Sequence, residues 1–179
     1  MKLVFIGYMA SGKSSIGRII AKKVQIPFID LDDFIEKKEN LSIVELFKTK
    51  GEIYFRKKET QFLEELLKNE ESFVLALGGG TPCYGKNIDL VNEFSTSVYL
   101  KSSLQNTYNI LSKAENKESR PLISAIPNEK LKEFIAKHLF ERTAYYQQAQ
   151  HAVLIDNKGM DEIAEEILIR LDDPALKKH

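Results

Sequence analysis

The chain has 179 residues, of which 43% are hydrophobic and 29% charged, and its 26 basic side chains balance 26 acidic ones. This length suits one well-cored globular domain, so we interpret residues 1–179 as a single domain. The neutral charge balance gives no reason to expect a nucleic acid or a membrane as a partner. Because the first apolar run begins at residue 3, we expect no signal peptide and a cytoplasmic location. We also expect a monomer. One cysteine and three scattered histidines predict neither a disulfide nor a zinc site.

The first predicted strand, residues 3–6, leads into GYMASGKS at residues 7–14, which matches the phosphate-binding pattern G-x-x-x-x-G-K-S/T. A strand, a glycine turn and a following helix aim backbone N–H groups and the positive end of a helix dipole at a bound phosphate. In this pattern Lys13 reaches the β- and γ-phosphates of a nucleotide, and the Ser14 hydroxyl ligates magnesium. The contacts predicted here for ATP are Gly7, Ala10, Ser11, Gly12, Lys13, Ser14 and Ser15.

Two carboxylates, Asp30 and Asp32, follow the second predicted strand, residues 26–29. Alternation along an extended chain would point both side chains the same way. A magnesium ion held by a loop serine needs a nearby carboxylate, and an attacking hydroxyl needs an acceptor for its proton. We expect Asp30 and Asp32 to divide these tasks. The alternative is that acidic residues here cap the next helix, which is the role we expect for Asp33.

Later segments continue the alternation of strands and helices. Strands are predicted at 73–77, 96–100 and 152–155, and helices at 51–69, at 128–149 and around 163–171. Ser42 and Ser102, each with Glu or Gln three residues later, predict capping boxes that begin two further helices. Uniformly apolar strands between helices predict a buried parallel sheet with helices on both faces. In such folds ligands bind beyond the carboxyl ends of the strands.

Two further features point to a small anionic ligand near that edge, and a third segment suggests a lid. The third strand ends in Gly78-Gly79-Gly80, which leaves backbone N–H groups open to close approach. Arginine is rare beside lysine, so we interpret Arg56, Arg120 and Arg142 as places where a planar bidentate donor is needed. The alternative for each is an ordinary ion pair with a glutamate. The polar segment 113–127, with prolines and little to bury, predicts either a lid or a connection without a role.

Together these motifs resemble the shikimate kinase family. The family pattern D-x-D is matched at residues 30–32, G-E-x-x-F-R-x-x-E at 51–59, G-G-G at 78–80, R-P-L at 120–122 and R-x-x-x-Y at 142–146, in the family's order behind the phosphate loop. The resemblance implies a three-layer P-loop NTPase fold, similar to nucleoside monophosphate kinases, with a five-stranded parallel sheet. It also implies a substrate-binding insertion at about 31–61 and a mobile lid at about 113–127.

The activity implied by this resemblance is transfer of the γ-phosphoryl group of ATP, with Mg²⁺, to the 3-hydroxyl of shikimate, giving shikimate 3-phosphate and ADP. The implied catalytic residues are Lys13, Asp32 and Arg120, and the implied metal site is Ser14 with Asp30. The implied shikimate-binding residues are Asp32, Arg56, Gly78, Gly79, Gly80 and Arg142. Lys113, Arg120 and Asn157 are the ATP contacts expected outside the phosphate loop.

Three positions depart from the family pattern. Ala10 stands where the loop usually has glycine, Lys113 stands where an arginine often packs on adenine, and Asn157 follows the last strand where threonine is common. The adenine contacts are therefore the part of the site that the resemblance defines least.

Two rival functions remain open at this point. Another small-molecule or nucleotide kinase would share the phosphate loop, but it would give no reason for two arginines placed for a carboxylate. A GTPase switch is favoured only by residues 157–161, NKGMD, which contain one residue more than the guanine-binding pattern N-K-x-D.

Overall fold

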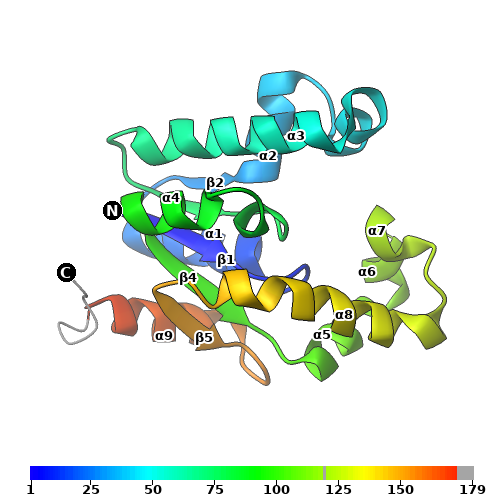
Figure 1. Ribbon diagram of the computed structural model, residues 1–179. Helices are drawn as coiled ribbons and strands as arrows, with labels where there is room; N and C mark the ends of the chain where they lie inside the picture. Colours follow the sequence, from blue (N-terminus) through cyan, green and yellow to red (C-terminus); the bar gives the residue numbers. More distant parts are fainter. Residues whose placement is uncertain (119, 173–179) are drawn as a thin grey trace.

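A computed structural model describes residues 1–118 and 120–172, and its centre is a parallel sheet between two layers of helices (Figure 1). The sheet has the strand order β2-β3-β1-β4-β5. Every adjacent pair of these strands is parallel. The strands are β1 (Lys2–Ile6), β2 (Phe28–Asp30), β3 (Phe73–Ala76), β4 (Thr96–Lys101) and β5 (His151–Leu154). The predicted fold class, with its five-stranded parallel sheet, is therefore confirmed.

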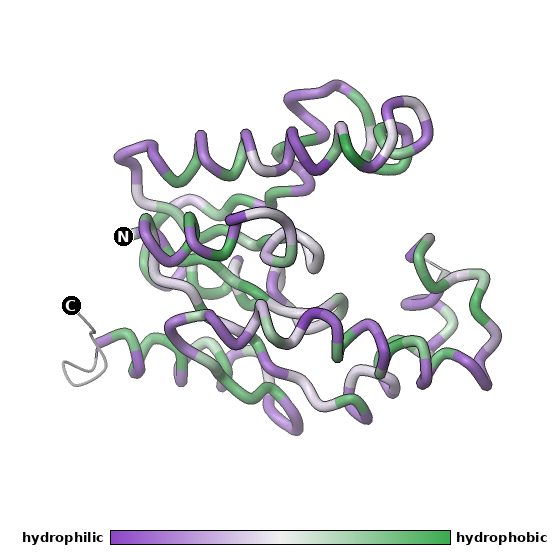
Figure 2. Tube along the Cα trace, viewed as in Figure 1, coloured by the Kyte–Doolittle hydropathy of each residue, from purple (hydrophilic) through white to green (hydrophobic). Residues whose placement is uncertain are grey.

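Alternate residues of the central strand β1 face the two helical layers. Leu3 and Phe5 belong to the core beneath α1 (Lys13–Val24) and α9 (Met160–Asp172). Val4 and Ile6 belong to the opposite core, beneath α3 (Ile43–Lys68), α4 (Asn87–Phe94) and α8 (Asn128–Tyr146). Burial of β1 on both faces explains why this strand is apolar at successive positions. The hydropathy colouring of Figure 2 shows that the strands at the centre are apolar, whereas the helices around them alternate between polar and apolar residues.

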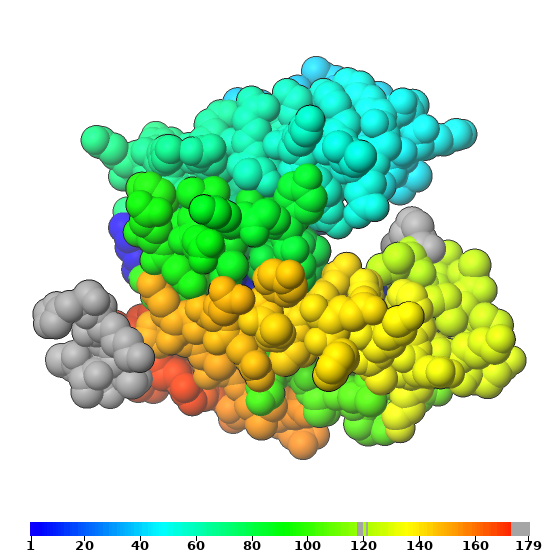
Figure 3. Space-filling model, viewed as in Figure 1, coloured from blue at the N-terminus to red at the C-terminus, as the bar shows by residue number. Residues whose placement is uncertain are grey.

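The remaining helices lie at the edge where the strands end. They are α2 (Leu31–Glu39), the short 3₁₀ helix η1 (Thr81–Cys83), α5 (Leu104–Leu111), α6 (Ala114–Glu118) and α7 (Pro121–Ser124). Figure 3 shows the surface hollowed between α3 and the segment that contains α6 and α7. The proposed insertion 31–61 corresponds to α2 and the first part of α3, and the proposed lid 113–127 corresponds to α6 and α7.

Helix α3 consists of two helical pieces that join at Gly51, whose backbone has φ 81° and ψ 168°. The first piece begins with the predicted capping box, in which Ser42 accepts the Glu45 N–H and the Glu45 side chain accepts the Ser42 N–H. The second piece carries Arg56. The glycine thus permits a change of direction between the capped start of α3 and its buried end.

Three local expectations need correction. The chain leaves β2 at Asp30, and Asp32 lies in the first turn of α2, so strand alternation does not relate the two side chains. Helix α5 is capped by Ser103, which accepts the Asn106 N–H, rather than by Ser102. The segment 113–127 also has an apolar anchor, because Ile123 is fully buried; residue 119 of this segment lies outside the described residues.

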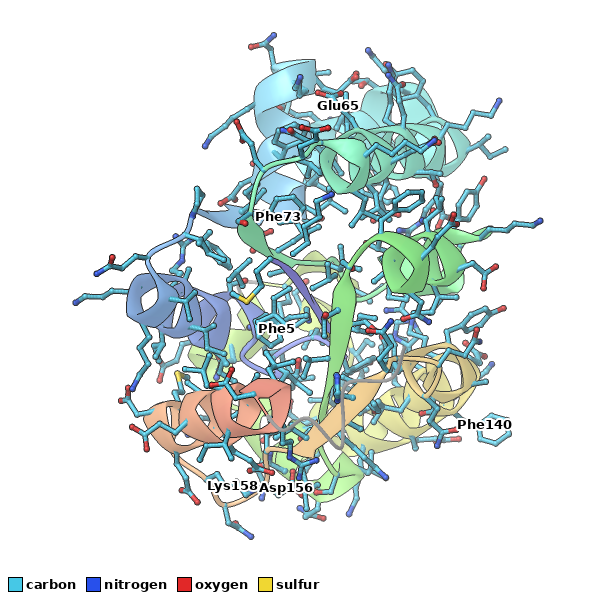
Figure 4. All side chains as sticks on the ribbon, turned by 90° about the vertical axis from the view of Figure 1, so that its left-hand side faces the viewer. Phe5, Glu65, Phe73, Phe140, Asp156 and Lys158 are labelled. Carbon is cyan, nitrogen blue, oxygen red and sulfur yellow. The ribbon has the colours of Figure 1, made fainter. Side chains whose placement is uncertain are left out.

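Phenylalanine side chains lie both in the core and on the surface. Figure 4 shows Phe5 and Phe73 inside the molecule, whereas Phe140 on α8 points away from it. None of the helices in residues 1–118 and 120–172 is both long enough and apolar enough to cross a membrane.

Candidate active site

The phosphate loop lies between β1 and α1, and its glycines are required by the backbone. Gly12 has φ 81° and occupies the N-cap position of α1. A Cβ on Gly7 would lie 2.9 Å from the Leu100 carbonyl oxygen, which is too close for any side chain there. Ala10 has φ 62°, a left-handed conformation in which a Cβ costs about 1 kcal/mol. Ala10, which stands where the family pattern usually has glycine, therefore holds a left-handed backbone at a cost in conformational strain.

The Lys13 ammonium is folded against its own loop. Its Nζ donates to the carbonyl oxygens of Gly7 and Tyr8, both at 2.9 Å. Burial lowers the pKa of Lys13 to about 8, and the negative charges of Asp32 and Asp30 partly offset this effect. Lys13 therefore stays positively charged at neutral pH and can pair with a phosphate that enters the loop.

Asp30 joins the phosphate loop to α2. Its Oδ2 accepts the Ser14 hydroxyl at 2.7 Å, and its Oδ1 accepts the Asp32 N–H at 3.1 Å, so that Asp30 is the N-cap of α2. The capping role considered for Asp32 and Asp33 thus belongs to Asp30. One carboxylate fixes both the serine of the loop and the start of the helix that carries Asp32.

The Ser14 and Asp30 oxygens fit a magnesium ion by their chemistry. Mg²⁺ prefers oxygen ligands and is commonly held by one or two protein oxygens together with substrate phosphates. The described residues contain no group of three His, Cys, Asp or Glu side chains that could hold a metal ion. A site made of two oxygens beside the phosphate loop suits a metal that arrives with its nucleotide.

Asp32 lies in the first turn of α2, facing the glycine segment Gly78-Gly79-Gly80. A Cβ on Gly78 would lie 3.1 Å from its Oδ1, so glycine is what permits this approach. Burial raises the pKa of Asp32 to about 6, with further increases from the charges of Asp30 and Glu59. A carboxylate whose pKa is raised toward neutrality is a better proton acceptor than an exposed one.

Arg56 is held by a buried carboxylate. Its Nη1 donates to Glu59 Oε2 at 2.7 Å, and Glu59 Oε1 accepts the Thr81 hydroxyl at 2.6 Å. Glu59 is 1% exposed, which makes this ion pair a fixed support for the guanidinium. A Cβ on Gly80 would lie 2.7 Å from Arg56 Nη2. Arg56 therefore lies against the glycine segment. The sequence motif alone did not assign a role to Glu59, the residue that supports Arg56.

Arg142 approaches the same segment from α8, which belongs to the same helical layer as α3. A Cβ on Gly79 would lie 3.4 Å from Arg142 Nη1. One turn later Tyr146 donates its hydroxyl to the Gly79 carbonyl oxygen at 2.6 Å. Each glycine of the segment thus lies against one predicted functional side chain, and two guanidinium groups flank a short stretch of backbone. Such a pair can grip a carboxylate with its two planar forks.

A cavity of about 440 Å³ opens beside the phosphate loop. It is lined by loop residues, by α5 and by the segment after β5: Ala10, Ser11, Gly12, Ile16, Asn106, Ile110, Ile155, Asn157, Lys158, Met160 and Ile163. The volume and the apolar walls suit a nucleobase. Asn157, one of the residues expected to contact ATP, lines this cavity. Lys113 is exposed and is not among the lining residues, and α5 contributes Asn106 and Ile110 there.

The loop after β5 is held by contacts with α5 and with α9. Asp156 accepts the Ser103 N–H at 3.0 Å, and this contact joins the loop to the start of α5. Lys158 pairs with Glu166 of α9. Figure 4 shows Asp156 and Lys158 close together at this end of the molecule.

Arg120 lies at the start of α7, where its Nη1 donates to the Asn116 carbonyl oxygen. Its positive charge lowers the pKa of Lys13, which places both cations in one electrostatic environment. The structure thus brings Lys13, Asp30, Asp32, Arg56, Gly78, Gly79, Gly80, Arg120 and Arg142 to one edge of the sheet. Ser15 is exposed on α1.

Comparisons with known proteins point to one family. The family model described as Shikimate kinase matches residues 9–172. A shikimate kinase of Flavobacterium johnsoniae is 51% identical over 168 residues, which cover 93% of this chain and 96% of that protein. The crystal structure of the Bacteroides thetaiotaomicron shikimate kinase superposes with a TM-score of 0.87 at 30% identity, covering 97% of this chain and 99% of the other.

A third relative comes with a ligand. The shikimate kinase from Acinetobacter baumannii, solved in complex with shikimate, superposes with a TM-score of 0.83 at 27% identity. The match covers 95% of this chain and 92% of that one.

Proposed function

The chain belongs to the shikimate kinase family and catalyses ATP-dependent phosphorylation of shikimate, and from this premise we propose how its own residues divide the work. The observation that carries the proposal is the meeting of Arg56, Arg142 and the glycine segment beside Asp32, at the mouth of a phosphate loop. The acceptor group that this arrangement would place for reaction is the 3-hydroxyl of shikimate.

In this proposal the two guanidinium groups and the Gly79 and Gly80 N–H groups bind the shikimate carboxylate. Glu59 keeps Arg56 oriented through its 2.7 Å ion pair. A bidentate grip at both ends of a carboxylate fixes the ring, so the hydroxyls are presented to Asp32. Asp32 then binds the hydroxyls and accepts the proton of the attacking one.

On the nucleotide side, the N–H groups of the phosphate loop and the start of α1 bind the phosphates of ATP. Lys13 and Arg120 stabilise charge on the transferring phosphoryl group, and the cavity beside the loop takes the base. Ser11, whose buried hydroxyl has no hydrogen-bond partner among the described residues, would gain an acceptor from a bound phosphate. Magnesium, held by Ser14 and Asp30, would neutralise phosphate charge during transfer.

The experiment that tests the function is ADP release coupled to a spectrophotometric reaction, with shikimate, gluconate and nucleoside monophosphates compared as acceptors. Only shikimate is expected to stimulate ADP release strongly. Lys13→Met should abolish the signal, because it removes a charge at the transferring group. Stimulation by another acceptor but not by shikimate would contradict the function and favour another kinase of this fold, and stimulation by none would contradict it outright.

The carboxylate grip predicts a severe effect of a conservative change. Arg56→Lys should raise the KM for shikimate at least tenfold while the KM for ATP changes little, because lysine offers a point charge in place of a planar fork. Arg170→Lys, which alters an arginine paired with Glu166 on α9, is the matched control and should leave both constants unchanged. An unchanged shikimate KM in Arg56→Lys would reduce Arg56 to a structural partner of Glu59.

A further inference from the structure

We propose that Tyr8 and His138 form a positioning contact that couples the phosphate loop to helix α8, so that nucleotide and shikimate strengthen each other's binding. The proposal deepens the function above and rests on it, since it takes the loop as the nucleotide site and Arg142 as part of the shikimate site. Neither Tyr8 nor His138 was assigned a role by the phosphate-loop pattern, in which Tyr8 occupies a variable position.

The contact itself is partly buried and specific. Tyr8 is 2% exposed, and its hydroxyl lies 2.9 Å from Nδ1 of His138. The two rings meet edge to face with centroids 5.5 Å apart, and Phe134 supports the imidazole from the same helix at 5.2 Å. A tyrosine in the phosphate loop is thus anchored to α8, in the helical layer on the other side of the sheet from α1, by a hydrogen bond and a ring contact together.

On the loop side, the backbone of the same tyrosine holds the catalytic lysine. The Tyr8 carbonyl oxygen accepts Lys13 Nζ at 2.9 Å and the Ser11 N–H at 3.3 Å. A phosphate that draws the Lys13 ammonium toward itself removes one of these bonds and changes the forces on Tyr8. Nucleotide binding therefore acts on the residue whose side chain reaches α8.

On the helix side, His138 shares a face with the groups that meet the glycine segment. His138, Arg142 and Tyr146 follow at intervals of four residues, which places them along one face of α8. Tyr146 donates to the Gly79 carbonyl oxygen, and Arg142 lies against the same glycine. A shift or rotation of α8 at His138 therefore moves the guanidinium that is proposed to hold the shikimate carboxylate.

Gly79 lies in contact with both the phosphate loop and Arg142. A Cβ on Gly79 would lie 3.6 Å from the Gly7 carbonyl oxygen and 3.6 Å from the Met9 nitrogen, as well as 3.4 Å from Arg142 Nη1. The backbone of the phosphate loop thus lies against Gly79, and the Arg142 and Tyr146 side chains bring α8 to the same point. Coupling through a packed junction of this kind needs no movement of a separate domain.

The test measures the coupling directly by isothermal titration calorimetry. In the unaltered protein, saturating MgADP should lower the Kd of shikimate about fivefold or more, and saturating shikimate should lower the Kd of MgADP by the same factor. Tyr8→Phe keeps the ring and removes the hydroxyl. In this variant both factors should fall to within twofold of one, whereas the Kd of shikimate alone stays within twofold of the original. A merely structural role would weaken both ligands without changing the factor.

Two further variants make the result decisive. His138→Phe removes the partner of the hydroxyl, and Tyr8→Phe with His138→Phe should lose no more coupling than either single change, because all three remove one interaction. Tyr54→Phe is the matched control, since it removes a hydroxyl that donates to Glu39 at 2.7 Å outside this contact, and it should keep the original factor.

Either of two results overturns the proposal: a factor near one in the unaltered protein, or an unchanged factor in Tyr8→Phe. Failure of the function proposed above would look different, because shikimate would then neither bind nor stimulate ADP release.

Discussion

Asp32, the proposed proton acceptor, is a residue whose burial costs the fold stability at neutral pH. Its carboxyl is buried beside Asp30, Glu59 and Glu36, with only Lys13 as a favourable charge among the groups that shift its pKa. The pKa near 6 means that the folded protein binds this proton more tightly than the unfolded chain does. The contribution of Asp32 to stability is therefore full below its ordinary pKa of 3.8 and is lost as the pH rises through about 6.

Asp32→Asn should abolish turnover and yet stabilise the protein at pH 7.5. The amide cannot accept the hydroxyl proton, but it removes a buried negative charge and should raise the unfolding free energy by about 2 kcal/mol. Urea unfolding at pH 7.5 and at pH 4 measures this effect, and the gain should shrink at the lower pH. A variant that is inactive and also less stable at pH 7.5 would mean that the carboxylate is not under this strain.

Ala10 is a second residue under strain, for a reason of backbone conformation. Its φ of 62° suits glycine, which loses no Cβ contact there but has more conformational entropy in the unfolded chain. Ala10→Gly should therefore raise the unfolding free energy by about 0.5 kcal/mol and retain turnover. Ala10→Val should lower it by at least 1 kcal/mol, because a β-branched side chain is less compatible with this conformation. Equal stabilities of all three proteins in denaturant titrations would contradict a strained loop.

At the scale of elements, α3 depends on the break at Gly51. The backbone there has φ 81° and ψ 168°, a region open essentially to glycine, and no atom lies within 4 Å of a Cβ added at this position. The cost of a side chain is thus conformational rather than steric. The second piece of the helix carries Arg56, so the break also decides where that guanidinium lies.

Gly51→Ala should lower the unfolding free energy by about 1–3 kcal/mol and raise the shikimate KM, with a smaller effect on the KM for ATP. Gly159→Ala is the control, because a Cβ there also meets no atom within 4 Å and no left-handed backbone is required. It should change stability by less than about 1 kcal/mol. If both alanine variants behave alike, the backbone at Gly51 is not what sets the direction of α3.

Local patterns predicted the elements better than their junctions. The Ser42 capping box and the strand before the phosphate loop are read from neighbouring residues, and both are present. The position of Asp32 could not be read in this way, since it depends on where Asp30 caps α2. Glu59 has the spacing of an ordinary ion pair with Arg56, and only the fold reveals that it is buried and accepts the Thr81 hydroxyl as well. The part that α5 plays in the cavity beside the phosphate loop escaped prediction, because Ile110 reaches the cavity through tertiary packing.

At the scale of the whole molecule, the segment 113–127 remains a predicted lid. Its described residues form α6 and α7, with Ile123 buried as an anchor, and Arg120 donates to the Asn116 carbonyl oxygen. We expect bound nucleotide to select a closed form by offering phosphate oxygens to Arg120. The anchor at Ile123 limits the motion to the parts around it.

Amide hydrogen exchange across 113–127 should slow when nucleotide and shikimate are both bound, because closure shields the segment from solvent. Arg120→Ala should reduce turnover by about 10²- to 10³-fold, on the scale of losing one preorganised donor, with shikimate affinity nearly unchanged. The exchange at Ile123 provides an internal reference, since its amide belongs to the anchored part. Equal exchange in the free and bound protein would exclude a ligand-gated lid.

The strand order has a consequence for how the protein is made. Strand β1 is central, and its hydrogen-bond partners come much later in the chain, with Lys2 opposite Phe73 and Leu3 opposite Thr96. At ribosomal speeds of about 5–20 residues per second, the apolar β1 therefore waits roughly 3–15 s before its first partner, β3, has been synthesised. During this interval the strand that begins the phosphate loop is an unpaired apolar segment on a nascent chain. Strand β1 is therefore exposed to aggregation during synthesis, although it lies at the centre of the finished sheet.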